Sequence, residues 1–149
     1  MNDLPAIDES VALIPSEPES AVPEIRIVIP GEAPRPPSAS RSWLRTPHSL
    51  YISAIVKAAE RAMCGEKPWT GPVELWISLE YLPPVKWTKA RRASMHWKIT
   101  APAAQNLVKL ILDGLTDVVF LEDEQVAVLH VSKVYGATAK TTITVRPLT

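Results

Sequence analysis

Four segments of the chain alternate apolar and polar residues, which is typical of β-strands buried on one face. The first is Glu24–Pro30, where Ile25, Ile27 and Ile29 share a face, and the second is Val73–Tyr81, which stops before Pro83-Pro84. The last two are Val126–Tyr135 and Lys140–Pro147. Only Gly136–Ala139 separates them, so they are predicted to form a hairpin.

Two other segments repeat apolar residues at steps of three and four, which indicates helices. The first begins at Thr46-Pro47, a capping hydroxyl followed by a proline suited to the first helical turn, and ends at Gly65. The second follows Pro102, and its apolar residues are Leu107, Leu110, Ile111 and Leu115. The order β-α-β-α-β-β predicts a small single α+β domain with two helices.

The second helix also carries a polar stripe. Gln105, Lys109 and Asp113 recur every four residues with Asn106 beside them, so they are predicted to lie on one exposed face. An acidic turn, Glu122-Asp123-Glu124, comes after the helix and just before a strand. We expect Asp123 at the lip of that strand, near the start of the second helix. Taken alone, such a turn is more often simply solvated.

Charge is distributed unevenly along a chain whose formal net charge is zero. Six of the 16 acids lie within the first 24 residues, where there is no Lys or Arg, so 10 acids and 16 bases remain and residues 25–149 carry a charge of +6. A basic domain suits a phosphate-binding surface, although many soluble domains are as basic.

The acidic segment 1–23 contains four prolines and no aromatic residue, and is predicted to be a disordered tail. It is either passive or a screen for the basic face of the domain, residues 24–149. The single Cys64 and the absence of zinc-ligand spacings favour a reducing compartment. No run of residues is apolar enough for a membrane span, and the N-terminus lacks the features of a secretory signal.

Two polar segments are candidates for contact with nucleic acid. Arg35, Arg41, Trp43 and Arg45 lie in or just after the proline-rich loop Gly31–Pro37. The segment Val85–Ala101 contains tryptophans, and its basic residues are Lys86, Lys89, Arg91, Arg92 and Lys98. Lys and Arg neutralise phosphates and Trp stacks on unpaired bases, whereas the alternative for each segment is a solvated connector. Neither His48 nor His130 has the company expected of a catalytic base or a metal ligand.

The region from Ala101 to Val126 resembles the RusA family of Holliday-junction endonucleases. The family pattern is roughly Lys-Pro-Asp-x-Asp-Asn-Leu-x-Lys, then a helix with Asp-x-Leu, then an acidic pair before x-Gln-Val. The matching residues are Pro102, Asn106, Leu107, Lys109, Asp113, Leu115, Glu122, Asp123, Gln125 and Val126, with Lys133 and Tyr135 in the following strand. The resemblance extends from about Glu24 onward and implies a RusA-like fold with a mixed sheet.

This sequence departs from the family pattern where the pattern has Asp-x-Asp. The positions of the two aspartates hold Ala103 and Gln105, and Ala101 replaces the preceding lysine. Mg²⁺ in nucleases is held by several converging carboxylates. Alanine offers no ligand and glutamine offers one neutral oxygen, so the scaffold of the site is present with only part of its chemistry.

The resemblance assigns roles to the residues that remain. Asp123 is the expected metal ligand, with Glu122 as a second ligand or a supporting acceptor. Lys109 is expected to hold the scissile phosphate or stabilise the leaving oxygen, and Asn106 to orient the start of the helix. Basic residues in family members approach DNA, which implies such contacts for Arg41 and Arg45 and for the basic residues of Val85–Ala101.

Three functions follow as hypotheses. The first is a junction endonuclease of recombination and repair, active as a homodimer with Mg²⁺ or Mn²⁺, in the cytoplasm of a bacterium and encoded by the host, a prophage or a phage. The second is a protein that binds branched DNA but cuts it poorly or not at all. The third is a basic domain that binds RNA or another protein. No membrane or small-molecule substrate is expected.

Overall fold

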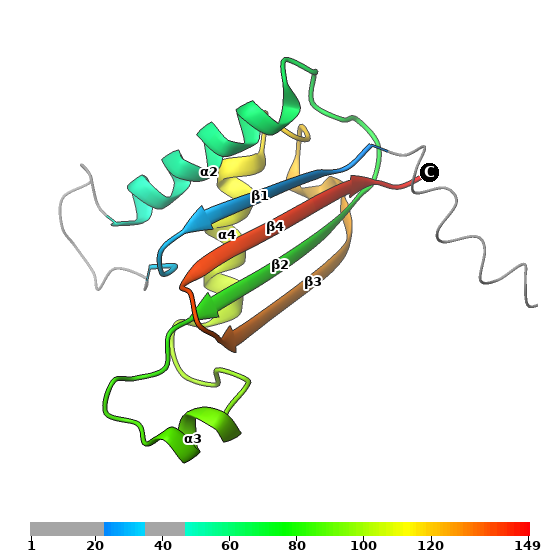
Figure 1. Ribbon diagram of the computed structural model, residues 1–149. Helices are drawn as coiled ribbons and strands as arrows, with labels where there is room; N and C mark the ends of the chain where they lie inside the picture. Colours follow the sequence, from blue (N-terminus) through cyan, green and yellow to red (C-terminus); the bar gives the residue numbers. More distant parts are fainter. Residues whose placement is uncertain (1–22, 35–46) are drawn as a thin grey trace, which may run out of the picture.

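The computed structural model describes residues 23–34 and 47–149, and its centre is a four-stranded sheet (Figure 1). The strands are β1 (Ile25–Pro30), β2 (Val73–Tyr81), β3 (Val126–Tyr135) and β4 (Lys140–Pro147), in the spatial order β1-β4-β2-β3. β2 and β3 are parallel, whereas β4 is antiparallel to both of its neighbours. The mixed sheet and all four predicted strands are therefore confirmed. The predicted hairpin of β3 and β4 is wrong, because β2 lies between these two strands and pairs with both of them.

Two long helices cover one face of this sheet, as the sequence predicts. They are α2 (Pro47–Met63) and α4 (Ala104–Leu115). A third helix, α3 (Lys89–Ser94), lies within the segment expected to be a loop and buries none of its residues. The Oγ1 atom of Thr88 accepts a hydrogen bond from the Arg91 amide at 3.1 Å and caps this helix. The predicted order of elements thus gains one short, exposed helix.

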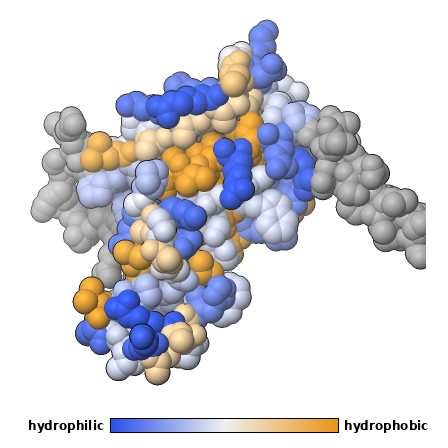
Figure 2. All heavy atoms as spheres, in the orientation of Figure 1, coloured by the Kyte–Doolittle hydropathy of each residue, from blue (hydrophilic) through white to orange (hydrophobic). Residues whose placement is uncertain are grey.

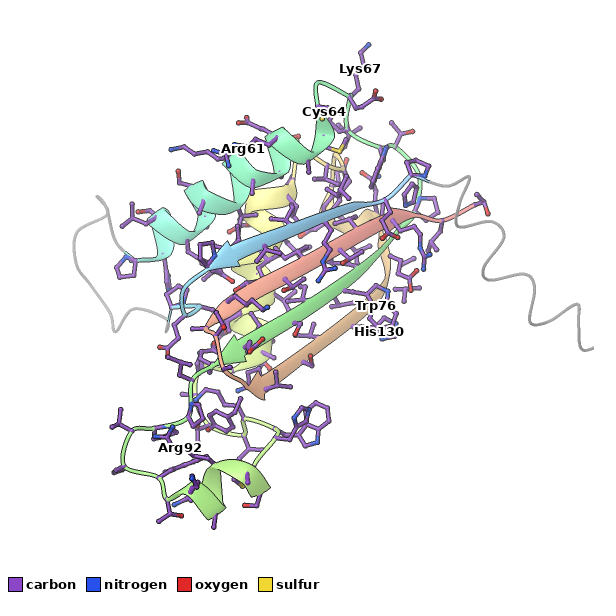
Figure 3. All side chains as sticks on the ribbon, viewed as in Figure 1. Arg61, Cys64, Lys67, Trp76, Arg92 and His130 are labelled. Carbon is purple, nitrogen blue, oxygen red and sulfur yellow. The ribbon has the colours of Figure 1, made fainter. Side chains whose placement is uncertain are left out.

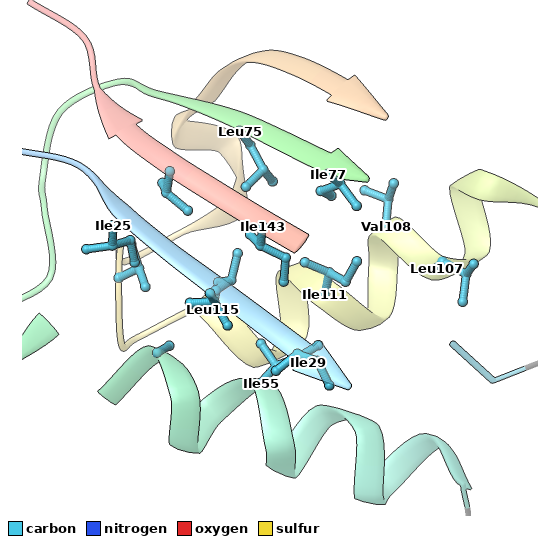
Figure 4. Close-up of a cluster of buried hydrophobic side chains, with 14 of the residues drawn as sticks. Ile25, Ile29, Ile55, Leu75, Ile77, Leu107, Val108, Ile111, Leu115 and Ile143 are labelled. Carbon is cyan, nitrogen blue, oxygen red and sulfur yellow. The ribbon is translucent and has the colours of Figure 1, made fainter. Parts of the chain in front are cut away.

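The core lies between the sheet and α2 and α4 (Figure 4). In β2 every second side chain from Val73 to Tyr81 is buried, and α4 contributes Leu107, Ile111 and Leu115, none of them exposed. Burial of each such side chain stabilises the fold by about 1.5–3 kcal/mol relative to an exposed position. The polar stripe of α4 faces away from this core, because Gln105, Lys109 and Asp113 are exposed.

The opposite face of the sheet has no helix upon it among the described residues. Trp76 is 45% exposed there, and the ring of His130 stacks on it with the centroids 3.7 Å apart (Figure 3). His130 Nε2 also lies 4.0 Å from Glu74 Oε2. His130 is therefore a strand residue with a partnered ring, as the sequence analysis concluded. Within residues 23–34 and 47–149, no helix is long and apolar enough to cross a membrane.

Candidate nucleic-acid interface at the start of helix α4

The start of α4 lies beside several of the polar residues that the sequence analysis singled out. Ala103 is its N-cap residue, and no side chain accepts a hydrogen bond from the first amides of the helix at that position. Gln105 and Asn106 follow in the first turn, and both are exposed. An aspartate at position 103 would both cap the helix and offer a metal ligand, so its replacement by alanine removes two contributions at once.

Lys133 of β3 fixes the chain just before this helix. Its Nζ donates hydrogen bonds to the carbonyl oxygens of Thr100 at 2.7 Å and Pro102 at 2.6 Å. Burial, and then the neighbouring charge of Lys98, lower the pKa of Lys133 from its ordinary value of 10.5. The match of Lys133 to the family pattern therefore has a structural reason, because this ammonium group ties α4 to the sheet.

The basic loop, residues 85–101, is attached to the sheet beside this point. The Lys98 amide donates to the Lys133 carbonyl, and the Tyr135 amide donates to the His96 carbonyl, both at 2.9 Å. These bonds place residues 96–98 alongside the end of β3 as a short antiparallel extension, with a bridge between Trp97 and Val134. The loop is therefore held against the body of the domain at its second end.

The interior of the basic loop is organised by Arg92. Its guanidinium donates to the carbonyl oxygens of Pro84 at 3.1 Å, Val85 at 3.0 Å and Trp87 at 3.3 Å (Figure 3). Arg92 was predicted to contact DNA, but these bonds give its guanidinium a structural role as well. Lys86 and Lys89 are exposed on the same loop. Figure 2 shows the loop as a lobe on which hydrophilic and hydrophobic residues alternate.

Two hollows flank the start of α4. The helix-side hollow, of about 270 Å³, is lined along the polar stripe by Asn106, Lys109 and Asp113, with His48 from the first turn of α2. The aromatic hollow, of about 430 Å³, lies between the basic loop and the sheet, and its principal lining residues are Glu32, Tyr81, Trp87, Arg91, Lys98 and Tyr135. The successive residues Ala33 and Pro34 line the aromatic and the helix-side hollow respectively, so the two are adjacent.

Sequence reasoning missed two features of this region. The sequence pattern assigned His48 no part in the site, yet it lines the helix-side hollow together with Lys109 and Asn106. Tyr81 was read only as a strand residue, yet it also lines the aromatic hollow. The sequence did carry a signal for the position of His48. A helix that begins at Thr46-Pro47 places its first turn, and His48 with it, at an end of the domain. No local signal marked Tyr81, because the hollow is made by residues far apart in sequence.

The acidic turn occupies the other end of the domain. Gln125 holds it there, because its Nε2 donates to the carbonyl oxygens of Trp69 at 2.9 Å and Gly71 at 2.8 Å, just before β2. Its Oε1 accepts from the Glu122 amide at 2.9 Å. Gln125, another residue of the family pattern, therefore fixes this turn to the segment before β2. Glu122 and Asp123 are both exposed on the turn.

The structure corrects the expected position of Asp123. β3 begins at Val126 beside the turn, and Lys133 reaches the start of α4 seven residues later. At about 3.3 Å per residue, this separation is about 23 Å along the strand. Figure 1 shows the same relation, because α4 begins near the ends of β2 and β3 and finishes near their starts. Asp123 and Glu122 therefore do not meet Asn106 and Lys109 within one protomer.

This separation decides whether one protomer suits a divalent cation. Mg²⁺ is bound by several oxygen ligands, and carboxylates are the principal protein ligands. Nowhere in the described residues do three His, Cys, Asp or Glu side chains come together as a metal site would require. Ala103 provides no ligand at the start of α4, and the acidic turn lies at the far end. The residues that the structure describes in one copy of the chain do not fit a catalytic Mg²⁺ ion.

Other predictions fall outside the described residues. Arg35, Arg41, Trp43 and Arg45 lie in the interval between residues 34 and 47, and the acidic tail lies almost wholly before residue 23. The proposed DNA contacts of Arg41 and Arg45 and the role of the tail therefore stay predictions.

The fold and the site together define the class of this protein. It is a small α+β domain that carries a basic, aromatic loop beside a polar helix start. The sequence profile of the family Endodeoxyribonuclease RusA matches residues 34–146 of the 149-residue chain. The chain belongs to the RusA family of endodeoxyribonucleases. A comparison with curated proteins gave no match.

Proposed function

We propose that this chain recognises four-way (Holliday) DNA junctions in recombination and repair as a homodimer, and that its cutting of them is impaired as the sequence stands. Membership of the RusA family supports the substrate class. The observation that carries the binding function is the anchored basic loop. No acidic residue occurs in it or in the chain that follows as far as Leu112. Its Lys98 is held beside the start of α4, where the family pattern puts the chemistry.

The helix-side hollow is the proposed place of one DNA phosphate. Lys109 and Asn106 line it beside the carboxylate of Asp113, so the hollow offers an ammonium group and an amide donor. Both groups donate hydrogen bonds to phosphate oxygens, and the cation also neutralises the phosphate charge. His48 of α2 forms another part of the wall of this hollow. This hollow binds and orients the backbone of the DNA, which does not depend on the missing carboxylates.

The proposed impairment of cutting follows from the side chains that are available to bind a metal ion. The described residues of one protomer offer no carboxylate cluster at the start of α4. Asp123 can join that helix start only when it comes from a second copy, as Asp123 of the partner subunit. Even then, Ala103 and Gln105 leave the composite site without the pair of carboxylates that the family pattern places there. A hard cation with so few anionic ligands is weakly held.

Binding is tested by titrating labelled four-way junction and linear duplex with the full chain at several salt concentrations. We expect tighter binding of the junction at about 0.15 M salt, and an affinity that falls as salt rises, because phosphate contacts release counterions. Lys109→Gln should weaken binding to both DNAs and reduce the salt dependence. Lys57→Gln is a matched control, because Lys57 is exposed on α2 and lines neither hollow. Equal affinity for junction and duplex would refute junction recognition.

Cutting is tested on a junction with Mg²⁺ or Mn²⁺, using the unmodified chain and the Ala103→Asp, Gln105→Asp double variant. We expect little or no cleavage by the unmodified chain and metal-dependent nicking by the double variant. Loss of a supporting group near a metal typically costs about 10–100-fold, and loss of two direct ligands costs more. Ala101→Lys is a further restoring change. Robust cutting by the unmodified chain would show that its remaining carboxylates suffice and would refute the impairment.

A further inference from the structure

The aromatic hollow is a built cavity that phosphate binding at the start of α4 does not use. Its volume of about 430 Å³ lies within the usual range of about 300–1,000 Å³ for small-ligand pockets. Three aromatic side chains, Tyr81, Trp87 and Tyr135, contribute to its lining together with two cations, Arg91 and Lys98. The hollow therefore combines flat apolar surfaces with two cations and one carboxylate, that of Glu32, so positive charge is in excess.

Two of the three aromatic side chains are in ring contact. The rings of Trp87 and Tyr135 meet edge to face, with centroids 5.0 Å apart and an interplanar angle of 63°. This pair spans the basic loop and the sheet, because Trp87 belongs to the loop and Tyr135 ends β3. An edge-to-face pair leaves the face of one ring free of the other ring, and a ring face is what a planar heterocycle stacks upon.

The cations are placed over these rings. The guanidinium carbon of Arg91 lies 4.4 Å from the centre of the Trp87 ring, and Lys98 Nζ lies 4.9 Å from the Tyr81 ring and 5.5 Å from the Tyr135 ring. Lys98 Nζ also donates a hydrogen bond to Thr100 Oγ1 at 2.8 Å, which holds the ammonium group near the start of α4. A ligand in the hollow would meet rings and cations together. This suits a nucleotide, because its base stacks on rings and its phosphate pairs with cations.

We infer that the aromatic hollow binds one unstacked base of a DNA strand at the junction branch point. Aromatic platforms combined with cations are the usual means by which proteins hold single-stranded nucleic acid. The adjacent helix-side hollow supplies a place for a phosphate of the same strand, because Ala33 and Pro34 form parts of the two walls. Branch points offer bases that unstack at lower cost than bases within a duplex. The inference rests on junction binding and names the part of the junction that the loop receives.

The test pairs changes in the protein with changes in the DNA. Junctions carrying a single abasic site at successive positions around the branch point are titrated with the full unmodified chain and with Trp87→Ala. For the unmodified chain, we expect one or two abasic positions to weaken binding by about 5–150-fold, which corresponds to one stacked base. For Trp87→Ala, the same abasic sites should cost little, because the platform is already lost.

Trp97→Ala is the matched control. Trp97 is 60% exposed on the same loop but does not line the aromatic hollow, so its variant should show the same abasic profile as the unmodified chain. Arg91→Gln is a second probe that keeps the ring platform and should weaken binding without abolishing the abasic effect. Thermal unfolding of each variant establishes that it is folded, and Trp87→Leu replaces Trp87→Ala where that variant is not.

The outcomes separate this inference from the proposed function. Unchanged junction preference without any abasic position that couples to Trp87 would overturn the base pocket and leave junction binding intact. Loss of junction preference in the unmodified chain would refute the proposed function itself. Free deoxynucleoside monophosphate that displaces the junction at concentrations near that of the junction would overturn the assignment to a DNA strand. Coupling confined to Trp87, with Trp97→Ala unaffected, is the result that supports the pocket.

Discussion

Gly114 of α4 lies so close to Ile55 of α2 that a Cβ atom at position 114 would be 2.7 Å from Ile55 Cγ2 and 2.9 Å from Ile55 Cβ. The backbone carbonyl oxygen of Ile52 would be 3.4 Å away. Ile55 is fully buried, so its side chain has little room to move away. The glycine lets the two helices pack at close range, and that contact sets the position of the polar stripe on α4.

Gly114→Ala should therefore destabilise the protein by about 1–3 kcal/mol, although alanine is the better helix former by about 1 kcal/mol. Urea unfolding measures the change. Gly71→Ala is the control, because a Cβ at position 71 meets nothing within 4 Å. A stabilising Gly114→Ala would mean that α2 and α4 adjust freely. In a double-mutant cycle with Ile55→Ala, the two costs should be less than additive, because the added methyl fills part of the space left by Ile55.

Two buried tyrosines are expected to respond in opposite ways to loss of the hydroxyl. Tyr51 Oη lies 2.6 Å from Thr141 Oγ1 in a buried hydrogen bond. Tyr81 Oη is buried and has no hydrogen-bond partner among the described residues. Tyr51→Phe leaves the Thr141 hydroxyl unpaired and should cost about 1–3 kcal/mol, whereas Tyr81→Phe should be neutral or stabilising by up to about 1 kcal/mol. Denaturant unfolding at pH 7 measures both changes, and equal losses would contradict the assignment.

The same tyrosines predict how stability depends on alkaline pH. Burial raises the pKa of Tyr51 from 10.0 to about 12, against a smaller opposing effect of the bond to Thr141, and burial also raises the pKa of Tyr81. Between about pH 10 and 12 the unfolded chain loses these protons while the folded chain keeps them, so stability falls as pH rises. Each group contributes at most about 1.4 kcal/mol per pH unit. Unfolding measured from pH 9 to 11 should give a shallower slope for Tyr51→Phe and the shallowest for the double phenylalanine variant.

Ala103→Asp is expected to stabilise the fold apart from any effect on cutting. Ala103 caps α4 with an extended backbone but without a side-chain acceptor, and no acid lies in the first turn. An aspartate there accepts a hydrogen bond from the helix amides and complements the helix dipole, which should add about 0.5–2 kcal/mol. Unfolding without metal isolates this effect from ligand binding. Ala103→Leu, which cannot cap, is the comparison, and equal stability of the two variants would show that the cap is not formed.

Separation of Asp123 from the start of α4 predicts complementation between subunits. A triple variant, Ala103→Asp, Gln105→Asp and Asp123→Asn, has the introduced carboxylate pair but lacks the acidic-turn ligand. Refolded together with the unmodified chain, it should give mixed dimers with one complete site and therefore metal-dependent nicking that neither chain shows alone. A mixture with the Asp123→Asn single variant should stay inactive. An inactive first mixture beside an active double variant would place the complete site within one protomer.

Sequence patterns predicted the strands and long helices because burial on one face leaves a regular period in the chain. The same patterns missed α3, which buries no side chain and is held instead by its Thr88 cap and by Arg92 bonds to nearby carbonyls. The family pattern identified Lys133 and Gln125 without explaining them. Their roles are hydrogen bonds to partners 31–33 and 54–56 residues away, which no local period encodes.

The position of the acidic turn could not be predicted for a related reason. Asp123 follows α4 in sequence, but the helix runs back along the sheet, so the turn arrives at the end opposite to the helix start. The polar stripe of Gln105, Lys109 and Asp113 was predicted correctly, because all three residues are exposed on α4. Lys109 and Asp113 also line one hollow with Asn106, whereas Gln105 does not. Sequence spacing therefore located the proposed phosphate-binding part of the site, whereas only the topology shows which residues remain apart.

The pairing of residues 96–98 with β3 also affects how the protein behaves at high concentration. β3 is the outer strand of the sheet on that side, and an outer strand with unpaired amides and carbonyls is a template for joining another sheet. The basic loop occupies part of this edge with its own backbone and surrounds it with cations that repel a like-charged copy. Shortening the loop should therefore reduce solubility as well as DNA affinity, because the segment proposed to contact DNA would also keep the sheets of neighbouring molecules apart.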